Sequence, residues 1–135
     1  MSYPRLYFGT VSKNAIDAVI DVANHYGNQF EFPLGLIASR RQVDYDSGYV
    51  GSTIGLYDYI KKSSEYVYLC RDHGGPNQGA IEDDGKRSFN TDVRCMDIIH
   101  IDPWKFVEEC NLLTGIDLTE KYIKHFYKAN TNIQF

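Results

Sequence analysis

Short apolar runs recur along the chain, and a stretch with helical periodicity follows each of them. The runs that we expect to be strands are residues 6–10, 34–39, 67–72 and 98–102. Their ends lie about 30 residues apart, which is the length of one repeated strand–helix unit. Continuous apolar strands that alternate with helices are typical of a parallel sheet covered by helices. The pattern therefore predicts an α/β fold with right-handed crossovers.

The helical stretches are defined by apolar residues three and four positions apart. In the first of them we expect Asn14 to be the N-cap and Gly27 to end the helix. Residues 53–64 and 88–96 carry the next two helical patterns. A helix that begins at Pro103 should end before Gly115, and a further helix should begin near Asp117. Residues 40–52 and 74–85 are predicted to be loops, and residues 132–135 to begin another strand.

Two architectures fit this alternation, an open doubly wound sheet and a (β/α)8 barrel. Both place functional loops after the carboxyl ends of the strands. No GxGxxG or Walker loop follows a strand, which disfavours a nucleotide-binding open sheet. We therefore predict one domain over residues 1–135, a partial (β/α)8 TIM barrel of about four to five units with parallel strands and helices on the outer face, which stops in strand five. If the chain ends there, its unpaired edge strands should favour dimerisation or poor solubility.

Charged and titratable residues gather where two of the predicted strands end. Asp72 and His73 close the third strand before a Gly-Gly-Pro break, and His100 and Asp102 close the fourth. Neighbouring parallel strands finish at the same edge, so these side chains should converge on one mouth. Carboxylates and imidazoles together suit a divalent metal or an acid/base pair. Two plainer interpretations stay open: Asp102 is an N-cap, and His100 is a core histidine.

Basic and glycine residues near the same edge suggest a site for an anion. Arg40 and Arg41 follow the second strand, and a guanidinium offers a planar fork to phosphate or carboxylate. A solvated loop face is the alternative for one of them. The backbone at Gly74 and Gly75 could present N–H groups to an oxyanion.

Composition limits the partners. The 135 residues are 43% hydrophobic with a net charge of −4, and basic residues form no run beyond pairs. We expect neither a nucleic-acid nor a membrane partner. The N-terminus lacks the features of a signal peptide, so we expect a cytoplasmic protein. Cys70, Cys95 and Cys110 show no CxxC spacing and are predicted to be reduced, buried residues.

Three motifs resemble a known family in the order in which they occur. The segments SRRQVDYDSGYVG, RDHGGPNQG and DIIHIDPW are similar to loop motifs of the so-called non-catalytic subunit of class II tagatose-bisphosphate aldolases. The resemblance spans residues 34–104 and implies a metal-dependent TIM barrel. It makes His73 the counterpart of the first zinc-binding histidine, Asp72 that of the acid/base aspartate, and Asp102 that of a carboxylate near the metal. The later histidines of such a zinc site would lie beyond Phe135.

We therefore expect a protein of sugar-phosphate metabolism that carries out metal-assisted aldol chemistry in its complete form. The alternative is a non-catalytic barrel subunit that stabilises a catalytic aldolase partner, and an unrelated open-sheet α/β module is a third interpretation. The expected cofactor is a divalent metal, zinc by resemblance, and the expected partners are a sugar-phosphate ligand and an aldolase subunit or a second copy of the chain. The candidate site residues are, for catalysis, Asp72 and Asp102; for the metal, His73 and His100; and for substrate, Arg40, Arg41, Gln42, Gly74, Gly75 and Asn77.

Overall fold

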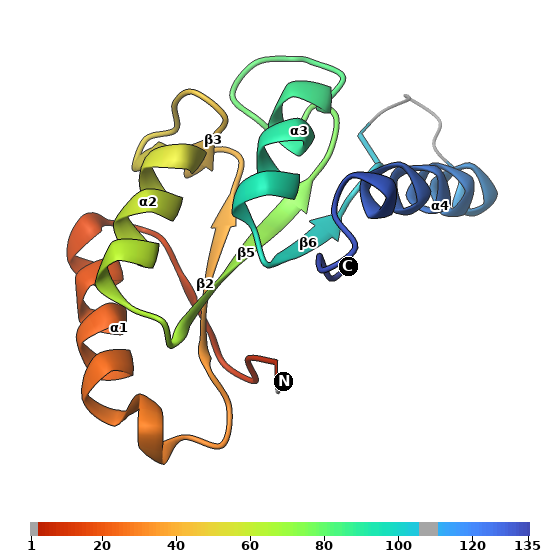
Figure 1. Cartoon of the computed structure of the whole chain (residues 1–135). Helices are drawn as coiled ribbons and strands as arrows, with labels where there is room; N and C mark the ends of the chain where they lie inside the picture. The colour runs from red at the N-terminus through yellow and green to blue at the C-terminus, as the bar shows by residue number, and fades with distance from the viewer. Residues whose placement is uncertain (1–2, 106–110) are drawn as a thin grey trace.

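A parallel sheet lies at the centre of the computed structural model, which describes residues 3–105 and 111–135 (Figure 1). The sheet has four strands in the order β1-β2-β5-β6, which is also their order along the chain. Each strand therefore lies beside the next one of the sheet, and a helix connects each pair. The strands are β1 (Tyr7–Gly9), β2 (Leu34–Ser39), β5 (Val67–Gly74) and β6 (Ile98–Ile101), and the helices between them are α1 (Lys13–Tyr26), α2 (Thr53–Ser63) and α3 (Lys86–Cys95). The prediction of an α/β fold with parallel strands is confirmed.

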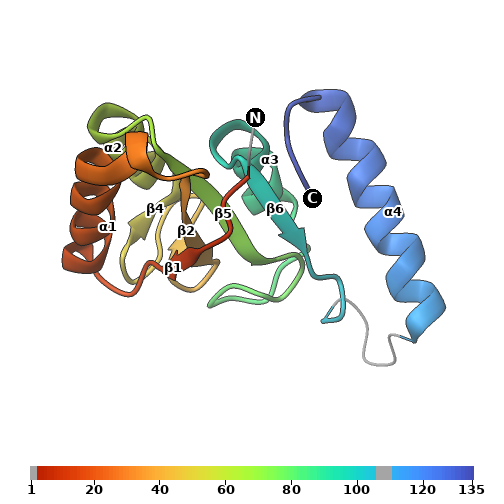
Figure 2. The same cartoon turned by 90° about the horizontal axis from the view of Figure 1, so that it is seen from below.

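One face of the sheet forms the core with the helices. Leu36, Leu69 and Ile99 are fully buried on neighbouring strands, and side chains of α1, α2 and α3 belong to the same buried cluster. Figures 1 and 2 show these three helices along the same side of the sheet. The alternation of side chains places Tyr68 and Ile98 on the other face, where both are only partly buried. The helix cover is thus one-sided, which is the arrangement expected for a curving sheet rather than for a doubly wound one.

Helix α1 begins earlier than the sequence predicts. Its N-cap is Ser12, whose hydroxyl oxygen accepts a hydrogen bond from the Ala15 N–H at 3.2 Å. The predicted cap, Asn14, lies inside the first turn. Lys13 pairs with Asp17 at 2.7 Å across one turn, which supports the earlier start. The 3-10 turn η1 (Gly27–Gln29) follows α1 directly.

The segment after β2 is more ordered than the predicted polar loop. It contains a two-stranded parallel sheet of β3 (Val43–Asp44) and β4 (Gly51–Ser52), which contacts α2. Val43 is fully buried in the core cluster. Val50 packs against the same cluster. These two valines fix a segment whose overall polarity hides this role in the sequence.

The two helices predicted after Pro103 are not what the structure shows. Helix α4 (Leu112–Ala129) continues through Gly115, with Asn111 as its N-cap. A Cβ at Gly115 would overlap the Trp104 ring, so the glycine makes room for the indole and does not end the helix. Residues 104 and 105 form a turn, and residues 106–110 of the expected helix, including Cys110, lie outside the described residues.

The last residues of the chain run beside β6. Gln134 forms a parallel bridge with Ile98, and its carbonyl oxygen accepts the Ile99 N–H at 2.8 Å. Where the sequence predicts the start of a strand, the structure has this single bridge. The free side of β6 is therefore partly occupied by the chain itself.

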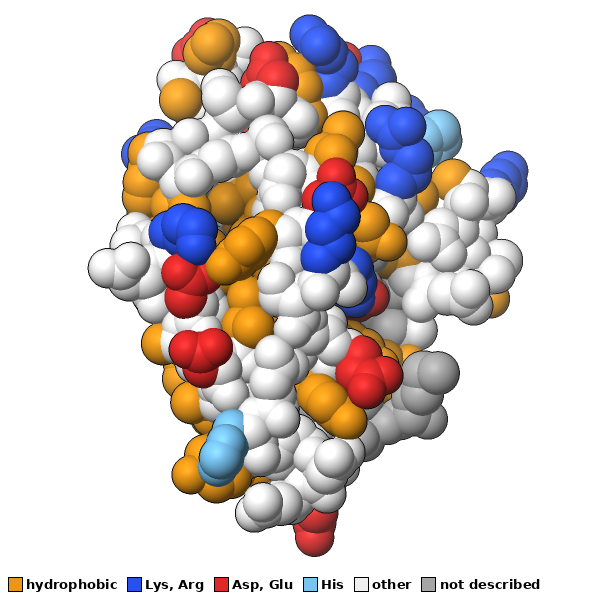
Figure 3. Space-filling model, turned by 60° about the vertical axis from the view of Figure 1, so that its left-hand side comes forward, with side chains coloured by type: hydrophobic (Ala, Val, Ile, Leu, Met, Phe, Trp, Pro, Cys, Tyr) orange, Lys and Arg blue, Asp and Glu red, His pale blue; other side chains and the backbone are white. Residues whose placement is uncertain are grey.

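The face covered by α1 and α2 carries acidic and basic side chains interspersed with apolar ones (Figure 3). Among the described residues, no helix has both the length and the apolar character needed to cross a membrane. Of the cysteines, Cys70 and Cys95 are free and buried, as predicted.

Candidate functional site

A β-bulge shapes the end of β5. Arg71 pairs with Ile99 and Gly74 pairs with Ile101, so β5 has one residue more than β6 over this interval. Asp72 and His73 therefore both stand opposite His100. His73 has a positive φ of 47°, a conformation that costs a non-glycine residue about 1–3 kcal/mol. Bulges redirect side chains next to functional sites, and this one turns two titratable groups toward β6.

The four titratable residues predicted to converge lie together at the ends of β5 and β6. His73 Nδ1 is 2.5 Å from Asp102 Oδ2, and His100 Nδ1 is 3.5 Å from Asp72 Oδ1. His73 Nε2 lies 3.8 Å from the same Asp72 oxygen. One ligand atom each of Asp72, His73 and His100 fall within 4.8 Å of one another, close enough to share a metal ion. The spatial prediction is met, whereas the catalytic and metal-binding roles remain predictions.

Asp102 uses its two carboxylate oxygens for different partners. Oδ2 contacts His73, while Oδ1 accepts the Trp104 N–H at 3.3 Å. Its backbone N–H donates to the Gly74 carbonyl oxygen at 2.7 Å, which ties the end of β6 to the end of β5. An ionised carboxylate only accepts hydrogen bonds, so the contact with Asp102 makes Nδ1 of His73 the donor and leaves Nε2 on the side of Asp72. Asp102 therefore caps a turn and orients His73 at once, with a side chain only 12% exposed.

The side chains of Gln42 and Asn77 hold loops in place. Gln42 accepts the Ser39 N–H at 2.9 Å, directly after β2. Asn77 has a φ of 56°, accepts the Asp83 N–H at 2.9 Å and donates to the Lys105 carbonyl at 2.8 Å. The predicted contacts of Gln42 and Asn77 with substrate thus compete with the contacts that these amides make to the protein.

Gly74 and Gly75 are buried at the base of the loop that follows β5. A Cβ at Gly75 would overlap the Asp102 carbonyl oxygen, so this close approach requires glycine. The Gly75 carbonyl accepts a hydrogen bond from Arg40. These contacts use the carbonyl oxygens of both glycines, and the binding of an oxyanion by their N–H groups remains a prediction.

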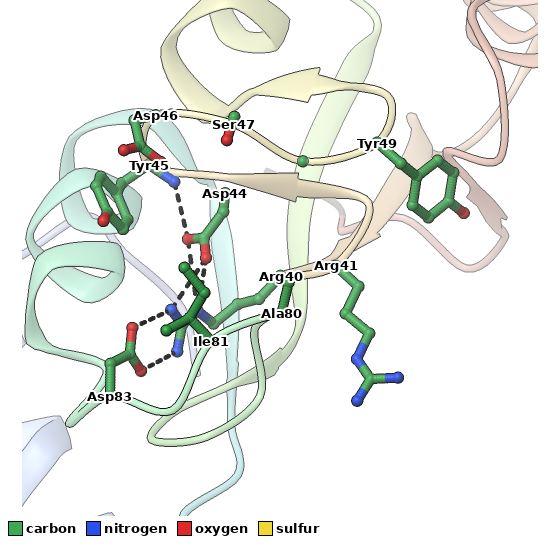
Figure 4. A pocket seen from close by; sticks show the side chains of 11 residues that line it. Arg40, Arg41, Asp44, Tyr45, Asp46, Ser47, Tyr49, Ala80, Ile81 and Asp83 are labelled. Carbon is green, nitrogen blue, oxygen red and sulfur yellow. Dashed lines mark hydrogen bonds and ion pairs between the residues drawn. The ribbon is translucent and has the colours of Figure 1, made fainter.

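Arg40 is buried, with 1% of its side chain exposed, and protein groups occupy its guanidinium (Figure 4). Nε and Nη2 donate to Asp44, with Nη2 2.9 Å from Oδ2. The two Nη atoms donate to Asp83 at 2.8 and 2.6 Å, and Nη1 also donates to the Gly75 carbonyl at 2.7 Å. An arginine has five N–H donors, so none is left here for a phosphate. The sequence shows the arginine pair but not the carboxylates that meet it.

Arg41, in contrast to Arg40, has a side chain that faces solvent. It is exposed, and Figure 4 shows it pointing away from the Arg40 network. The predicted anion contact therefore rests on Arg41 rather than on both arginines. Both arginines line a pocket of about 670 Å³ between the segment after β2 and the loop after β5, together with Asp44, Tyr45, Asp46, Ser47, Gly48, Tyr49, Ala80, Ile81 and Asp83.

The Arg40 network shifts the pKa values of Arg40 and Asp83. The hydrogen bond from Arg40 holds the pKa of Asp83 below its usual range, although partial burial opposes this. Burial alone would lower the pKa of Arg40, but Asp83 and Asp44 outweigh it and raise that pKa. Arg40 and Asp83 are therefore both charged near neutral pH.

Acid should weaken the fold through Asp83. A carboxyl whose pKa is lower in the folded chain than in the unfolded one, at about 3.9, stabilises the fold above that value and loses its effect as the pH falls through the folded pKa. We compare urea midpoints at about pH 5 and about pH 3. The midpoint of the wild type should fall below about pH 4, and the midpoint of Asp83→Asn should fall less. Asp46→Asn, on an exposed loop position, serves as the control. Equal pH dependence in the wild type and Asp83→Asn would contradict this prediction.

A second buried arginine, Arg71, was not predicted to be structural. It is fully buried and forms a bidentate pair with Asp92 of α3, with Nη2–Oδ1 2.7 Å and Nε–Oδ2 3.0 Å. It also donates to the carbonyl oxygens of Ala38 and Val43 and to the Thr53 hydroxyl. These contacts join β5 to β2, β3, α2 and α3 directly beneath Asp72.

The sequence contains a signal for this role. Val67, Leu69 and Arg71 alternate along β5, which puts Arg71 on the helix-covered face and Asp72 on the other. A charge on that face must be paired, because an unpaired charge in a core is very costly. In the sequence analysis, no role was assigned to Arg71.

Cys70 lies on the same face as Asp72, one layer below it. Burial, followed by the charge of Asp72, raises the pKa of its thiol to about 12. The thiol is therefore protonated near neutral pH. Cys70 contributes packing to the site rather than a thiolate ligand.

The parallel sheet, its one-sided helix cover and the polar strand ends define an α/β protein whose candidate site lies at the carboxyl edge of the sheet. A crystal structure of similar fold is that of a probable tagatose 6 phosphate kinase from Sinorhizobium meliloti 1021, with a TM-score of 0.71 and 15% sequence identity over 93% of this chain. The chain spans 36% of the length of that neighbour. No family model and no curated protein sequence matches. The likeness shows the fold, and membership of the class II aldolase family is not confirmed.

Proposed function

We propose that this chain holds a divalent metal ion at the ends of β5 and β6 and belongs to a protein of carbohydrate metabolism. The observation that carries this proposal is the grouping of Asp72, His73 and His100, whose ligand atoms lie within 4.8 Å of one another. The hydrogen bond from His73 to Asp102 adds to it, because metal-binding histidines commonly donate their second ring N–H to a carboxylate.

The donor set suits a catalytic ion better than a purely structural one. Two imidazoles and one carboxylate bind zinc and related transition metals, and three protein ligands leave a coordination position open for water or substrate. A bound ion would supply Lewis acidity toward a carbonyl oxygen. In this arrangement Asp102 fixes the ring of His73, and the second carboxylate oxygen of Asp72 is free to accept a proton.

Two independent features favour a sugar phosphate as the substrate class. The solved neighbour is named for tagatose 6-phosphate, and the loop motifs of this chain resemble those of a tagatose-bisphosphate aldolase subunit. The finer proposals follow from the same features: a partial (β/α)8 barrel and class II aldolase-type cleavage in the complete protein. The consecutive order of the strands and the bridge at Gln134, which continues the sheet beyond β6, support the barrel.

The supporting-subunit alternative also has an observation in its favour. His73 and His100 already contact Asp102 and Asp72, at 2.5 and 3.5 Å, so the cluster is satisfied by its own members. A subunit that stabilises an aldolase could retain these four residues as a structural network. Metal binding separates this role from the first one.

Metal titration tests the proposal. We expect the wild-type chain to bind one equivalent of Zn²⁺ or Co²⁺ in isothermal titration calorimetry, and His73→Gln and His100→Gln to lose most of this affinity. The chain provides matched controls, because His25→Gln and His125→Gln alter the exposed histidines of α1 and α4 and should bind metal as the wild type does. An absence of stoichiometric binding, or equal losses in all four variants, would reject the metal site.

The reaction is tested separately on the full-length protein. We expect retro-aldol cleavage of a ketose bisphosphate that depends on added metal and is lost in Asp72→Ala. Metal binding without turnover would reject the aldolase proposal. Co-purification with an aldolase in the absence of both metal and turnover would favour the supporting subunit.

A further inference from the structure

We infer that Arg40 and Asp83 form a positioning clamp that sets the His73–Asp102 pair through Gly75. The clamp is a feature of this chain's own loops, and it lies outside the residues that would touch a metal. The proposal rests on the proposed function only where metal affinity is used as a readout.

A continuous set of contacts leads from the clamp to the site. Arg40 Nη1 donates to the Gly75 carbonyl at 2.7 Å. Gly75 in turn packs so closely on the Asp102 carbonyl that a Cβ would not fit. The Asp102 N–H donates to the Gly74 carbonyl at 2.7 Å, and Asp102 Oδ2 holds His73. A shift of Gly75 therefore moves the carboxylate that orients His73.

Asp83 fixes the guanidinium from the far end of the same loop. It receives two hydrogen bonds from Arg40, at 2.8 and 2.6 Å, and a third from the Gly85 N–H at 3.0 Å. Asn77 closes the loop between them, since its amide oxygen accepts the Asp83 N–H and its own N–H donates to the Asp83 carbonyl. The loop after β5 is thus held at Gly75 and at Asp83 by a single guanidinium.

The two carboxylates of the cluster have different attachments. Asp44 belongs to β3 and ties Arg40 to the segment after β2. Asp83 belongs to the loop that begins at Gly75. Loss of either carboxylate weakens the ion-pair network, but only loss of the Asp83 carboxylate removes the tie between the guanidinium and the far end of the loop. Arg40 itself is not replaceable by lysine, because an ammonium group has three donors and no planar fork.

The test compares Asp83→Asn and Arg40→Lys with the matched variant Asp44→Asn. The metal-free readout is the downfield proton NMR signal of the His73 Nδ1–H in its short hydrogen bond, assigned by its loss in His73→Gln. We expect this signal to move upfield or broaden in Asp83→Asn and Arg40→Lys under conditions where both are folded. In Asp44→Asn it should stay in place, although the urea midpoint falls.

Co²⁺ affinity provides the second readout. It should fall about tenfold in Asp83→Asn, in line with the effect of groups that orient metal ligands, and less in Asp44→Asn. If Arg40→Lys does not fold, the comparison is made with Asp83→Asn alone, because this variant keeps the guanidinium of Arg40. An unchanged NMR signal in a folded Asp83→Asn, or its absence from the wild type, would overturn the clamp. Failure of every variant, wild type included, to bind Co²⁺ would reject the proposed function and leave the NMR comparison intact.

Discussion

Replacement of Arg71 by methionine should lower the free energy of unfolding by about 3–5 kcal/mol, because it leaves a buried carboxylate without its counter-charge. Arg71 and Asp92 are both fully buried, and their bidentate contact is inaccessible to water. Burial raises the pKa of Asp92, and the charge of Arg71 opposes this effect. Without Arg71, Asp92 must take up a proton or remain an unpaired charge in the core. Urea unfolding followed by circular dichroism measures the loss.

A double variant separates the cost of the lost charge from the cost of the lost contacts. Arg71→Met combined with Asp92→Leu should recover part of the stability, because apolar groups often replace a buried ion pair without penalty. Recovery should be incomplete, since the carbonyl oxygens of Ala38 and Val43 lose their donor. Lys13→Met breaks an exposed ion pair and should leave the midpoint nearly unchanged. A single variant Arg71→Met as stable as Lys13→Met would contradict the prediction.

Local sequence patterns predict most of the helices and strands of the fold. The bounds of β2 and the start of α2 follow the sequence pattern, because apolar runs and helical spacing are properties of neighbouring residues. The convergence of Asp72, His73, His100 and Asp102 followed from one rule, that adjacent parallel strands end at the same edge. These predictions needed no knowledge of distant contacts.

Distant contacts explain what the sequence concealed. Gly115 makes room for the Trp104 ring inside α4, and no local signal connects these two residues. The occupation of the Arg40 guanidinium by protein groups depends on Asp83, 43 residues away in the chain. The bulge at His73 depends on the register between β5 and β6. Each is a property of the packed molecule rather than of a segment.

The two buried arginines perform a common task at the carboxyl edge of the sheet. Strands that end in a parallel sheet leave carbonyl groups without partners, and a buried carbonyl needs a donor. Arg71 donates to the carbonyls of Ala38 and Val43, and Arg40 donates to that of Gly75. Their carboxylate partners balance the charge. The floor of the candidate site is therefore rigid, which a metal centre needs if its ligands are to keep their geometry.

Substitution of Asp102 by asparagine should weaken metal binding about 10–100-fold while the fold is retained, because the two side chains have nearly the same shape. Asp102 accepts hydrogen bonds at both oxygens, from His73 and from the Trp104 N–H. Asparagine has one oxygen and one NH2 group, so one of the two contacts must bring donor against donor. If the NH2 faces His73, Nδ1 must accept a hydrogen bond, and the proton moves to Nε2, where it blocks the proposed ligand atom.

Competition with a fluorescent zinc chelator would measure Kd for the wild type, Asp102→Asn and the control Asp46→Asn. The two variants lose the same charge, so a general electrostatic effect would weaken both alike. A larger increase in Kd for Asp102→Asn than for Asp46→Asn would show that the carboxylate orients His73. This increase should be smaller than the increase in His73→Gln, which removes a metal ligand. Equal Kd values for Asp102→Asn and the wild type would show that His73 does not depend on Asp102 for its orientation. The arrangement of carboxylate, histidine and metal proposed for this site would then be wrong.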